Sequence, residues 1–535
     1  MRRFFTAAAV AAALSVVLSA AEATPKLVVL VVVDQMRADY VERFQANWTS
    51  GLKRLVTQGA WYTRAAYPYL TTVTCAGHAT LGTGAYPHTH GIFANTWYDR
   101  ARGAVVPCTD DVAVSAVSYG KGAAGHFGPG YLQTPTLADE LRGKGAHVVT
   151  LALKARSAIM MAGHGGDAVT WISESLDSWE TSTAYAQTPV AQVKAYADAN
   201  PLAGDYGKVW KHTLSDAAYQ DPDAGLAEDP TPGWTATFPH ALTSASGSAD
   251  PRYYDLWQHS PFADAYVARM AGALTASMQL GKRDGTDFLG VSFSSPDLVG
   301  HAFGPRSQEI QDMYANLDVS VGVLIDALDK AVGPGNYTLA LSADHGVTNI
   351  PEQIRKSGKD GGRIDAQAAF NAGEAAAVKA MGPGKYIARI TGNEIYFEPG
   401  AYAKVRTNPK ALKAIASAIV KVPGIGRVFN TDEMEKGVSS KDPLTRAAAL
   451  SHVAGRGGEM AISPKTGWMF STTGTTHGNA SPDDQRIPIL LFGAGVKPGR
   501  YEQAASPADV APTLAHLAGV PLPKAEGRVL SEALR

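Results

Sequence analysis

The sequence contains little cysteine, no excess of charge of either sign and no long apolar run beyond its N-terminus. Only two cysteines occur among 535 residues, so a structural metal site built from four thiolates is excluded. The 48 basic and 49 acidic residues nearly balance, which argues against a nucleic-acid-binding module or an anionic membrane as a partner. Internal repeats, low-complexity tracts and Gly/Ser linkers are also absent, so no independent domain on a flexible tether is expected.

The N-terminus has the pattern of an export signal. Arg2 and Arg3 precede an alanine-rich apolar core at residues 7–18 and an A-x-A cleavage site, with a weak likeness to twin-arginine signals. The apolar core is shorter than the roughly 20 residues of a membrane-spanning helix, and no later stretch is long enough to span. We therefore expect residues 1–23 to be a cleaved signal peptide. Residues 24–535 would form a soluble, monomeric protein located in the periplasm or secreted.

The two cysteines allow two states. In an oxidising compartment Cys75 and Cys108 could form a disulfide bond. Free buried cysteines are also common, and Cys75 adjoins a candidate nucleophile described below. The sequence leaves both states open.

Apolar runs that end in polar residues indicate an α/β fold with a largely parallel sheet. The 45% hydrophobic content and 54 glycines suit a loop-rich α/β enzyme, and the length allows a large domain with insertions. Residues 26–33 (KLVVLVVV) form a continuous β-branched run, typical of a strand buried on both faces of a parallel sheet. Further strands are expected at 146–153, 287–293, 337–342 and 487–492, and helices at 39–58, 136–144, 266–280, 308–332 and 507–517.

Two long segments interrupt this pattern. Residues 159–284 are irregular and rich in tryptophan, and residues 350–470 contain strand-like pieces and a helix near 412–421. We interpret both as insertions embedded in one catalytic domain. The first is expected to pack over the sheet and to shape the rim of the active site.

A hydroxyl-rich stretch, TTVTCAGH at residues 71–78, leads into a short helix. Thr74 would lie at the helix N-terminus, where unpaired N–H groups and the helix dipole favour a phosphate or an alkoxide. Threonine is a weak nucleophile, and metal coordination is one of the few ways to activate it. Taken alone, a threonine at such a helix start is usually an ordinary helix cap.

Carboxylates and imidazoles follow most of the predicted strands. They are Asp34, Asp297, His301, Asp344, His345 and His477. Open α/β sheets bind ligands at the carboxyl ends of their strands, so these side chains are expected to converge there. Oxygen and nitrogen donors without thiolate suit catalytic zinc, and six ligands match two zinc ions that keep open positions. Each motif alone could be a turn or a cap.

Three other polar residues are candidates for binding an anion. Lys154 and Arg156 follow a predicted strand two positions apart, so on a strand they would point to the same side. They could bracket an anion or be solvated surface charge. Asn95 lies among apolar neighbours and could donate N–H to a phosphate oxygen or cap a turn. We interpret the nearby pair His88 and His90 as a structural turn and not as a metal site.

Together these motifs resemble those of the alkaline phosphatase superfamily. The likeness runs from about residue 25 to residue 534 and is carried by Asp34, by Thr74 in TCAGH, and by the motifs DLVGH, DHG and THG that contain the other ligands. The branch it resembles contains the nucleotide pyrophosphatase/phosphodiesterases and the threonine-type, PafA-like bacterial alkaline phosphatases. The resemblance implies a three-layer α/β/α fold with a largely parallel central sheet and two embedded insertions.

The resemblance also implies how two zinc ions would be held. Thr74 would be a ligand of one of them and the nucleophile that forms a phosphothreonine intermediate. Asp34, Asp344 and His345 would hold the zinc ion that binds Thr74, and Asp297, His301 and His477 would hold the other.

The substrate prediction depends on the cationic pair. Monoesterases of this branch combine an asparagine with a Lys-x-Arg pair, as Asn95, Lys154 and Arg156 do here. Diesterases generally lack the pair, so we predict an alkaline phosphatase acting on small-molecule phosphate monoesters.

Other functions are less favoured. A phosphodiesterase or nucleotide pyrophosphatase with the same metals is the main alternative. A sulfatase is disfavoured because Cys75 is not followed by the C-x-P-x-R pattern. Cofactor-independent phosphoglycerate mutase shares the fold but not the export signal. A non-catalytic exported protein that binds zinc or glycans would not need an intact nucleophile and six intact ligands.

Overall fold

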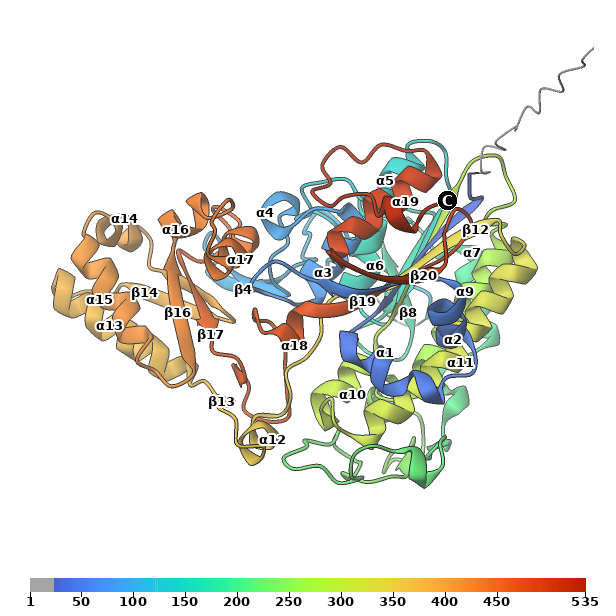
Figure 1. The fold of residues 1–535 in the computed structure, drawn as a ribbon, viewed down its shortest axis with the longest axis horizontal. Coiled ribbons are helices and arrows are strands. Elements are labelled where there is room, and N and C mark those ends of the chain that lie inside the picture. Colours follow the sequence, from blue (N-terminus) through green and yellow to red (C-terminus); the bar gives the residue numbers. More distant parts are fainter. Residues whose placement is uncertain (1–23, 121, 123) are drawn as a thin grey trace, which may run out of the picture.

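The computed structural model of the chain describes residues 24–120, 122 and 124–535. The predicted signal peptide at residues 1–23 lies outside the described residues. Figure 1 shows a large body built on a central sheet and a smaller lobe, coloured orange, at its side. Among the described helices, none combines the length and the apolar character needed to cross a membrane.

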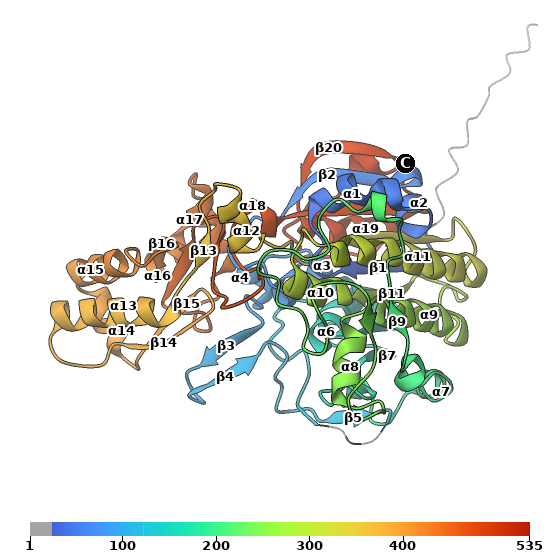
Figure 2. The same cartoon turned by 90° about the horizontal axis from the view of Figure 1, so that it is seen from below.

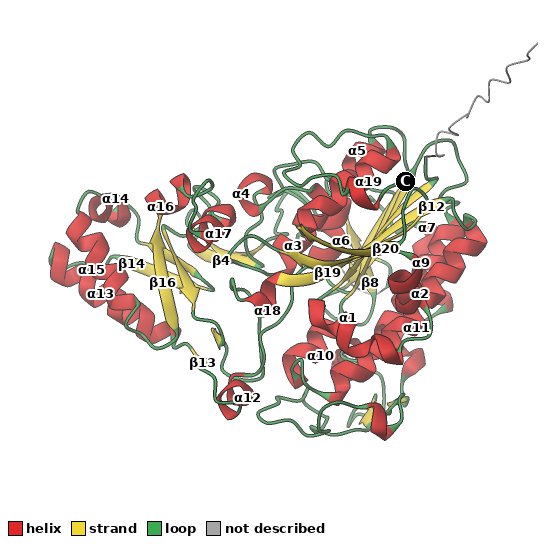
Figure 3. Cartoon of the chain, viewed as in Figure 1, coloured by secondary structure: helices red, strands yellow, loops and turns green. Residues whose placement is uncertain are grey.

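Ten strands of the described chain form the central sheet, drawn as arrows in Figure 3. Five neighbouring strands pair with one another in parallel, in the spatial order β12 (Tyr337–Ser342), β1 (Leu27–Val33), β11 (Asp287–Phe293), β6 (Val148–Ala152) and β7 (Ala168–Ile172). Beyond β12 follow β19 (Arg486–Gly493), β2 (Ala60–Ala66) and β20 (Gly499–Ala505), and beyond β7 follow β8 (Trp179–Ser182) and β5 (Ala116–Ser118). All residues of β1 are buried, as expected for a β-branched strand covered on both faces. The predicted, largely parallel sheet is confirmed.

Helices cover both faces of this sheet, which gives the predicted α/β/α layers (Figure 2). One face carries α3 (Thr74–Thr83), α5 (Leu137–Arg142), α6 (Ala155–Ala162) and α19 (Val510–Ala518). The other carries α1 (Ala38–Phe44), α2 (Gly51–Gln58), α9 (Pro261–Ser277) and α11 (Gln308–Ala331). The apolar faces of these helices and the sheet form one continuous hydrophobic core.

The expected helix at 39–58 is broken into two. α1 continues as a 3₁₀ turn at Gln45–Asn47, and α2 begins at Gly51. The Asp318 carboxylate of α11 accepts hydrogen bonds from the backbone N–H groups of Thr49 and Ser50, at 2.7 Å each, and so caps α2 from a distant part of the chain. A Cβ at Gly51 would lie 2.2 Å from the backbone nitrogen of Gly322, so the glycine permits close packing against α11. This tertiary contact stabilises the break, which Ser50-Gly51, a turn-forming pair, also favours locally.

Residues 350–470 form the lobe and have a core of their own. A four-stranded sheet of β14 (Ile387–Thr391), β15 (Glu394–Phe397), β17 (Met460–Pro464) and β16 (Ile425–Asn430) packs with α13 (Ala366–Met381) and α15 (Pro409–Ile419). Also in this segment are α12 (Pro351–Lys356), β13 (Gly362–Arg363), α14 (Ala401–Arg406), α16 (Thr431–Lys436), α17 (Pro443–Ser451) and β18 (Trp468–Met469). Ser451 Oγ accepts hydrogen bonds from the N–H groups of Leu70 and Thr71, so the lobe contacts the chain that leads into α3.

The segment 159–284 is not wholly an insertion, which corrects the boundary expected from the sequence. Its strands β7 and β8 belong to the central sheet, and its helix α9 packs against β6 and β11. Outside the sheet lie α7 (Ala191–Ala199), β9 (Val209–Trp210), β10 (His240–Ala241) and α8 (Pro251–Gln258). The two strands are five and four residues long and lie within a segment that reads as irregular.

Candidate active site

Polar residues from four segments meet at one edge of the central sheet. Asp34 follows β1, Asp344 and His345 follow β12, and Asp297 and His301 lie on α10 (Ser295–Phe303), which follows β11. Because β1, β11 and β12 are parallel, their carboxyl ends share this edge. His477 precedes β19, which is antiparallel to β12, so the amino end of β19 lies at the same edge.

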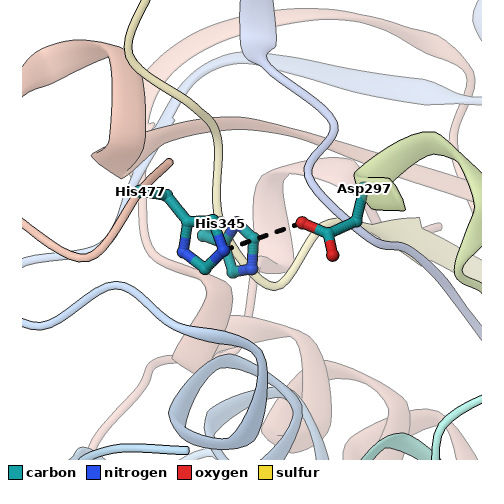
Figure 4. A group of neighbouring side chains, drawn as sticks. All are labelled: Asp297, His345 and His477. Carbon is teal, nitrogen blue, oxygen red and sulfur yellow. Dashed lines mark ion pairs between the residues drawn. The ribbon is translucent and has the colours of Figure 1, made fainter. Parts of the chain in front are cut away.

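Six candidate ligands form one cluster at this edge. The ligand atoms of Asp297, His345 and His477 lie within 4.8 Å of one another, as do those of Asp34, Asp344 and His345. Figure 4 shows the first group, in which His477 and His345 are stacked and His477 points toward Asp297. His301 Nε2 is 3.1 Å from Asp297 Oδ1, which joins the sixth residue to the cluster.

The three histidines are held in the orientation that suits metal binding. His301, His345 and His477 donate Nδ1–H to the backbone oxygens of Thr475, Gly346 and Thr72, at 2.8, 2.9 and 2.8 Å. These bonds leave each Nε2 free as a ligand and fix the ring, which is the usual support of a metal-binding imidazole. Burial lowers the pKa of His345 and, more strongly, of His477, which favours the neutral imidazole that binds metal.

The carboxylates also fit a cation. Asp34 Oδ1 and Asp344 Oδ2 are buried and make no hydrogen bond to any described residue. Burial, and then the charges of Asp297 and Asp344, raises the pKa of Asp34 well above its ordinary value. Buried carboxylate oxygens that accept no hydrogen bond are costly unless an ion or proton satisfies them. The donor set therefore fits divalent metal ions bound through oxygen and nitrogen.

Thr74 lies beside this cluster at the N-terminus of α3. Its side chain is buried, and its Oγ1 is 3.4 Å from His345 Nε2. A Cβ at Gly77 would lie 2.1 Å from the backbone oxygen of Asp344, so the glycine of TCAGH lets α3 approach the chain that carries two ligands. The hydroxyl is thus placed where a helix N-terminus meets the predicted metal site.

The two cations lie next to the cluster, but not as a strand would place them. β6 ends at Ala152, Lys154 precedes α6, and Arg156 lies in the first turn of α6, so the two-residue strand argument is wrong. Lys154 Nζ lies 2.5 Å from Asp34 Oδ2 and 2.6 Å from Asp297 Oδ2. The half-buried Arg156 guanidinium pairs with no carboxylate in the described part of the chain.

Asn95 lies close to the start of α3. Its Oδ1 accepts a 2.8 Å hydrogen bond from the backbone N–H of Cys75, and its side chain lines the cleft beside His477. Cys75 and Cys108 form a disulfide, which decides between the two states left open by the sequence.

His88 and His90 lie apart from the cluster, as interpreted from the sequence. Both lie on the short helix α4 (Pro87–His90), and His90 is fully buried with its Nε2 3.2 Å from Thr80 Oγ1. His88 Nε2 lies 3.2 Å from a carboxylate oxygen of Glu526. Both imidazoles thus have local partners, in keeping with a structural turn.

Two supporting residues were missed. Gln35 donates from Nε2 to Asp297 Oδ1 at 2.6 Å, and its backbone N–H donates to Asp344 Oδ1 at 3.1 Å. His78 Nδ1 is 2.9 Å from the backbone oxygen of Thr74 and 3.3 Å from Asp344 Oδ2. His78 lies inside the TCAGH motif and Gln35 directly follows a ligand, so position in the motifs was the only available signal.

A cleft of about 180 Å³ adjoins the cluster. It is lined on one side by Asn95 and His477 and on the other by residues of the lobe, among them Asn393, Met469 and Phe470. The tryptophan-rich segment was expected to shape the rim, but this cleft is lined by the other insertion. The reason is that 350–470 packs against the chain before α3, whereas 159–284 contacts α10 instead, where Asp229 N–H donates to the backbone oxygen of Ala302.

Comparisons with known proteins agree with this geometry. The sequence profile of the type I phosphodiesterase/nucleotide pyrophosphatase family matches residues 28–483. This chain belongs to that family. Within it, the chain is 31% identical to alkaline phosphatase PhoV of Synechococcus elongatus over 96% of this chain and 94% of that protein. It is also 31% identical to alkaline phosphatase PafA of Elizabethkingia meningoseptica, over 95% and 94% of the two chains.

Structural comparison places this family member near the same relatives. The crystal structure of alkaline phosphatase PafA matches with a TM-score of 0.86 at 29% identity, covering 96% of this chain and 99% of that one. A PafA variant with a TM-score of 0.88 carries replacements at a threonine, an asparagine, a lysine and an arginine. Murine ectonucleotide pyrophosphatase/phosphodiesterase 5, at 14% identity and a TM-score of 0.55, shares the fold. The predicted resemblance to the PafA-like branch is confirmed.

Proposed function

We propose that this protein hydrolyses phosphate monoesters at the clustered site, with Thr74 as the nucleophile and two zinc ions as cofactors. The protein is an enzyme of the alkaline phosphatase type, as its likeness to PhoV and PafA over nearly the whole chain indicates. The observation that carries the proposal is the position of Thr74 Oγ1, at a helix N-terminus and 3.4 Å from His345 Nε2.

The proposal divides the six ligands into two sets of three. Zinc bound by these residues would supply Lewis acidity that favours deprotonated Thr74 and stabilises the leaving oxygen. Asp297 would share one ion with His301 and His477, whose Nε2 atoms lie 3.1 and 3.6 Å from its Oδ1. Asp34, Asp344 and His345 would hold the other ion, beside Thr74.

The reaction would proceed in two displacements at phosphorus. In the first, Thr74 Oγ1 attacks the phosphorus, the new O–P bond forms as the bond to the leaving oxygen breaks, and the alcohol departs. In the second, water attacks the phosphothreonine, the Thr74 O–P bond breaks, and inorganic phosphate leaves as the hydroxyl is restored. The N–H groups at the start of α3 that remain unpaired, which do not include that of Cys75, would bind phosphoryl oxygens during both steps.

Arg156 and Asn95 together provide binding groups for the three terminal oxygens of a monoester. Arg156 lacks an ion-pair partner within the described chain and can bind two phosphoryl oxygens as a fork. The side-chain Oδ1 of Asn95 accepts a hydrogen bond from Cys75 N–H. Its Nδ2 therefore remains to donate to the third phosphoryl oxygen. A monoester dianion has three terminal oxygens, whereas a diester has two and one charge fewer. A diesterase with the same site is the second candidate, supported by the family profile.

A panel of substrates combined with metal analysis tests this proposal. The purified enzyme should contain about two zinc ions per chain and should turn over nitrophenyl phosphate far faster than its bis-ester or a nitrophenyl sulfate. Faster turnover of the bis-ester would favour the diesterase. Bound zinc without turnover of any ester would contradict the enzymatic proposal.

We also propose that the protein acts outside the cytoplasm. The residues of the predicted signal peptide lie outside the described chain, so the support comes from the Cys75–Cys108 disulfide. Disulfides persist mainly in oxidising compartments such as the periplasm and the cell exterior. N-terminal sequencing of the exported protein should find Thr24 as its first residue.

A further inference from the structure

Asn95 is held at both ends by the two residues of the disulfide. Its side-chain Oδ1 accepts a hydrogen bond from Cys75 N–H at 2.8 Å, and its backbone oxygen accepts one from Cys108 N–H at 2.9 Å. Cys75 and Cys108 are buried and bonded to each other. The three residues thus form a closed ring of one covalent bond and two hydrogen bonds.

This ring joins the start of α3 to the base of a β-hairpin. Cys75 is the second residue of α3 and follows Thr74 directly. Asn95 and Cys108 flank the hairpin of β3 (Thr96–Asp99) and β4 (Ala104–Pro107), which projects away from the sheet in Figure 2. Movement of the hairpin would therefore be transmitted to Asn95 unless its base were tied to α3.

The ring also determines what Asn95 can offer to a ligand. Since Oδ1 accepts from Cys75, the amide group is fixed in one orientation, with Nδ2 left to donate. Nδ2 makes no hydrogen bond to the described residues, and Asn95 lines the cleft together with Val73 and His477. A free amide donor and the Thr74 hydroxyl are thus anchored to the same turn of α3.

We propose that the Cys75–Cys108 disulfide is a positioning element of the active site, which holds the Asn95 amide at a set place relative to Thr74. The inference rests on the proposed function, in which Asn95 donates to a phosphoryl oxygen. A disulfide that served only as a staple would stabilise the fold and leave the reaction of the folded enzyme unchanged. The positioning role instead predicts an effect that depends on the presence of Asn95.

A double-mutant cycle separates the two roles. Asn95→Ala should lower kcat/KM for nitrophenyl phosphate about 100-fold, because a preorganised donor is lost. The pair Cys75→Ala, Cys108→Ala should lower it about 10-fold in folded, zinc-loaded enzyme, because a small misplacement of a donor is enough. In the Asn95→Ala background the cysteine pair should cost less than about twofold, since residues of one network are not additive. The inhibition constant of inorganic phosphate should follow the same pattern.

Three outcomes would overturn the proposal. One is that the cysteine pair lowers kcat/KM by the same factor in the Asn95→Ala background as in the wild type. Another is that the cysteine pair variant has a lower melting temperature but the same kcat/KM as the wild type. The third is an Asn95→Ala variant as active as the wild type, which would refute the role of Asn95 itself and thereby the basis of the inference. The second outcome would refute only the positioning role and would leave the role of Asn95 unchanged.

A second measurement avoids substitution of the buried cysteines. The wild-type chain can be produced in a reducing cytoplasm, loaded with zinc and assayed before and after oxidation, with thiols counted after unfolding. Oxidation should raise kcat/KM about 10-fold in the wild type and less than about twofold in Asn95→Ala. Equal gains in both proteins would contradict the proposal.

Discussion

Gln35 donates a 2.6 Å hydrogen bond from Nε2 to Oδ1 of Asp297, a residue far away in the sequence. The contact explains the glycine of the DLVGH motif, since a Cβ at Gly300 would lie 1.8 Å from Gln35 Oε1. Gln35 thus supports Asp297 through its side chain and Asp344 through its backbone. One residue at the end of β1 braces carboxylates that follow two other strands.

Removal of this brace should weaken metal binding. We expect Gln35→Ala to reduce zinc affinity by about 10- to 100-fold, the usual effect of losing an outer hydrogen bond to a metal ligand. Competition with a chelator measures the affinity. Gln367→Ala, a change at an exposed glutamine of the lobe, should leave zinc affinity unchanged; an equal loss in both variants would refute the brace.

Thr74 should be indispensable for turnover but not for metal binding. Thr74→Ala should lower kcat by at least about 10³-fold while zinc content stays at the wild-type level, because only the nucleophile is lost. Thr74→Ser keeps a hydroxyl and should retain measurable turnover and a phosphorylated intermediate after acid quench. Wild-type activity in Thr74→Ala would remove the nucleophile assignment.

Arg156 should discriminate between monoesters and diesters. Arg156→Ala should lower kcat/KM for nitrophenyl phosphate about 100-fold and that for the bis-ester about 10-fold or less, because the monoester has one more charge and one more free oxygen. Arg156→Lys, which keeps the charge but loses the fork, should fall between these values.

The corresponding substitution, Lys154→Ala, has to be assayed together with its zinc content. Lys154 contacts Asp34 and Asp297, so its removal alters the proposed metal ligands as well as the anion site. Arg156 lacks such contacts, which makes its variants the cleaner test. Equal losses on both substrates in Arg156→Ala would show that the cation does not set the preference.

The lobe should influence the reaction through Asn393. This buried side chain donates from Nδ2 to the backbone oxygen of Gly478 at 2.6 Å and so ties the β14–β15 turn to the loop that carries His477. Asn393→Ala should lower kcat/KM about 10-fold while the lobe stays folded. Asn371→Ala, on the outer helix α13, is the control, and an equal effect there would point to general destabilisation.

The buried pair His240 and Glu309 should make stability depend on pH. His240 Nε2 lies 3.0 Å from Glu309 Oε1, and both side chains are fully buried. Burial raises the pKa of Glu309 to about 9 and lowers the pKa of His240 to about 4. The pair is therefore neutral at pH 7 in the folded protein, with the proton on Glu309.

The sign follows from proton counts. Between the ordinary pKa of histidine, about 6.5, and pH 9, the folded pair holds one proton and the unfolded pair holds none. Folding stability contributed by the pair therefore falls as pH rises, by at most about 1.4 kcal/mol per pH unit. Glu309→Gln cannot lose this proton, so its melting temperature should fall less than that of the wild type between pH 6.5 and 8.5. An equal fall in the melting temperatures of Glu309→Gln and the wild type between these pH values would contradict the neutral pair.

The features that sequence patterns predicted best are those with a local cause. The β-branched run KLVVLVVV predicted a strand covered on both faces, and β1 is buried throughout. Small residues after Thr74 and the glycine at the end of the run predicted α3, which spans Thr74–Thr83 and ends at Gly84 in a left-handed conformation. Asp34, Asp297 and Asp344 come after such strands. Because parallel strands have their carboxyl ends at one edge of the sheet, the sequence predicted that these side chains lie close together.

Features with a distant cause were missed or misplaced. The break before Gly51 is stabilised by the Asp318 carboxylate of another helix. The start of α6 at Ala155 placed Arg156 on a helix and not on a strand. Short strands β7 and β8 became recognisable only through their neighbours in the sheet.

By itself the sequence determined that Asp34, Asp297 and Asp344 lie near one another, because hydrophobic runs specify strands and the polar residues behind those runs meet at one edge of a parallel sheet. Only the tertiary structure decided how the residues are held: that Gln35 braces two carboxylates, that the disulfide closes around Asn95, and that the lobe lines the cleft. The reason is physical. Strand formation depends on the polarity of neighbours along the chain, whereas a hydrogen bond or disulfide between remote residues depends on distances that exist only after the layers have packed.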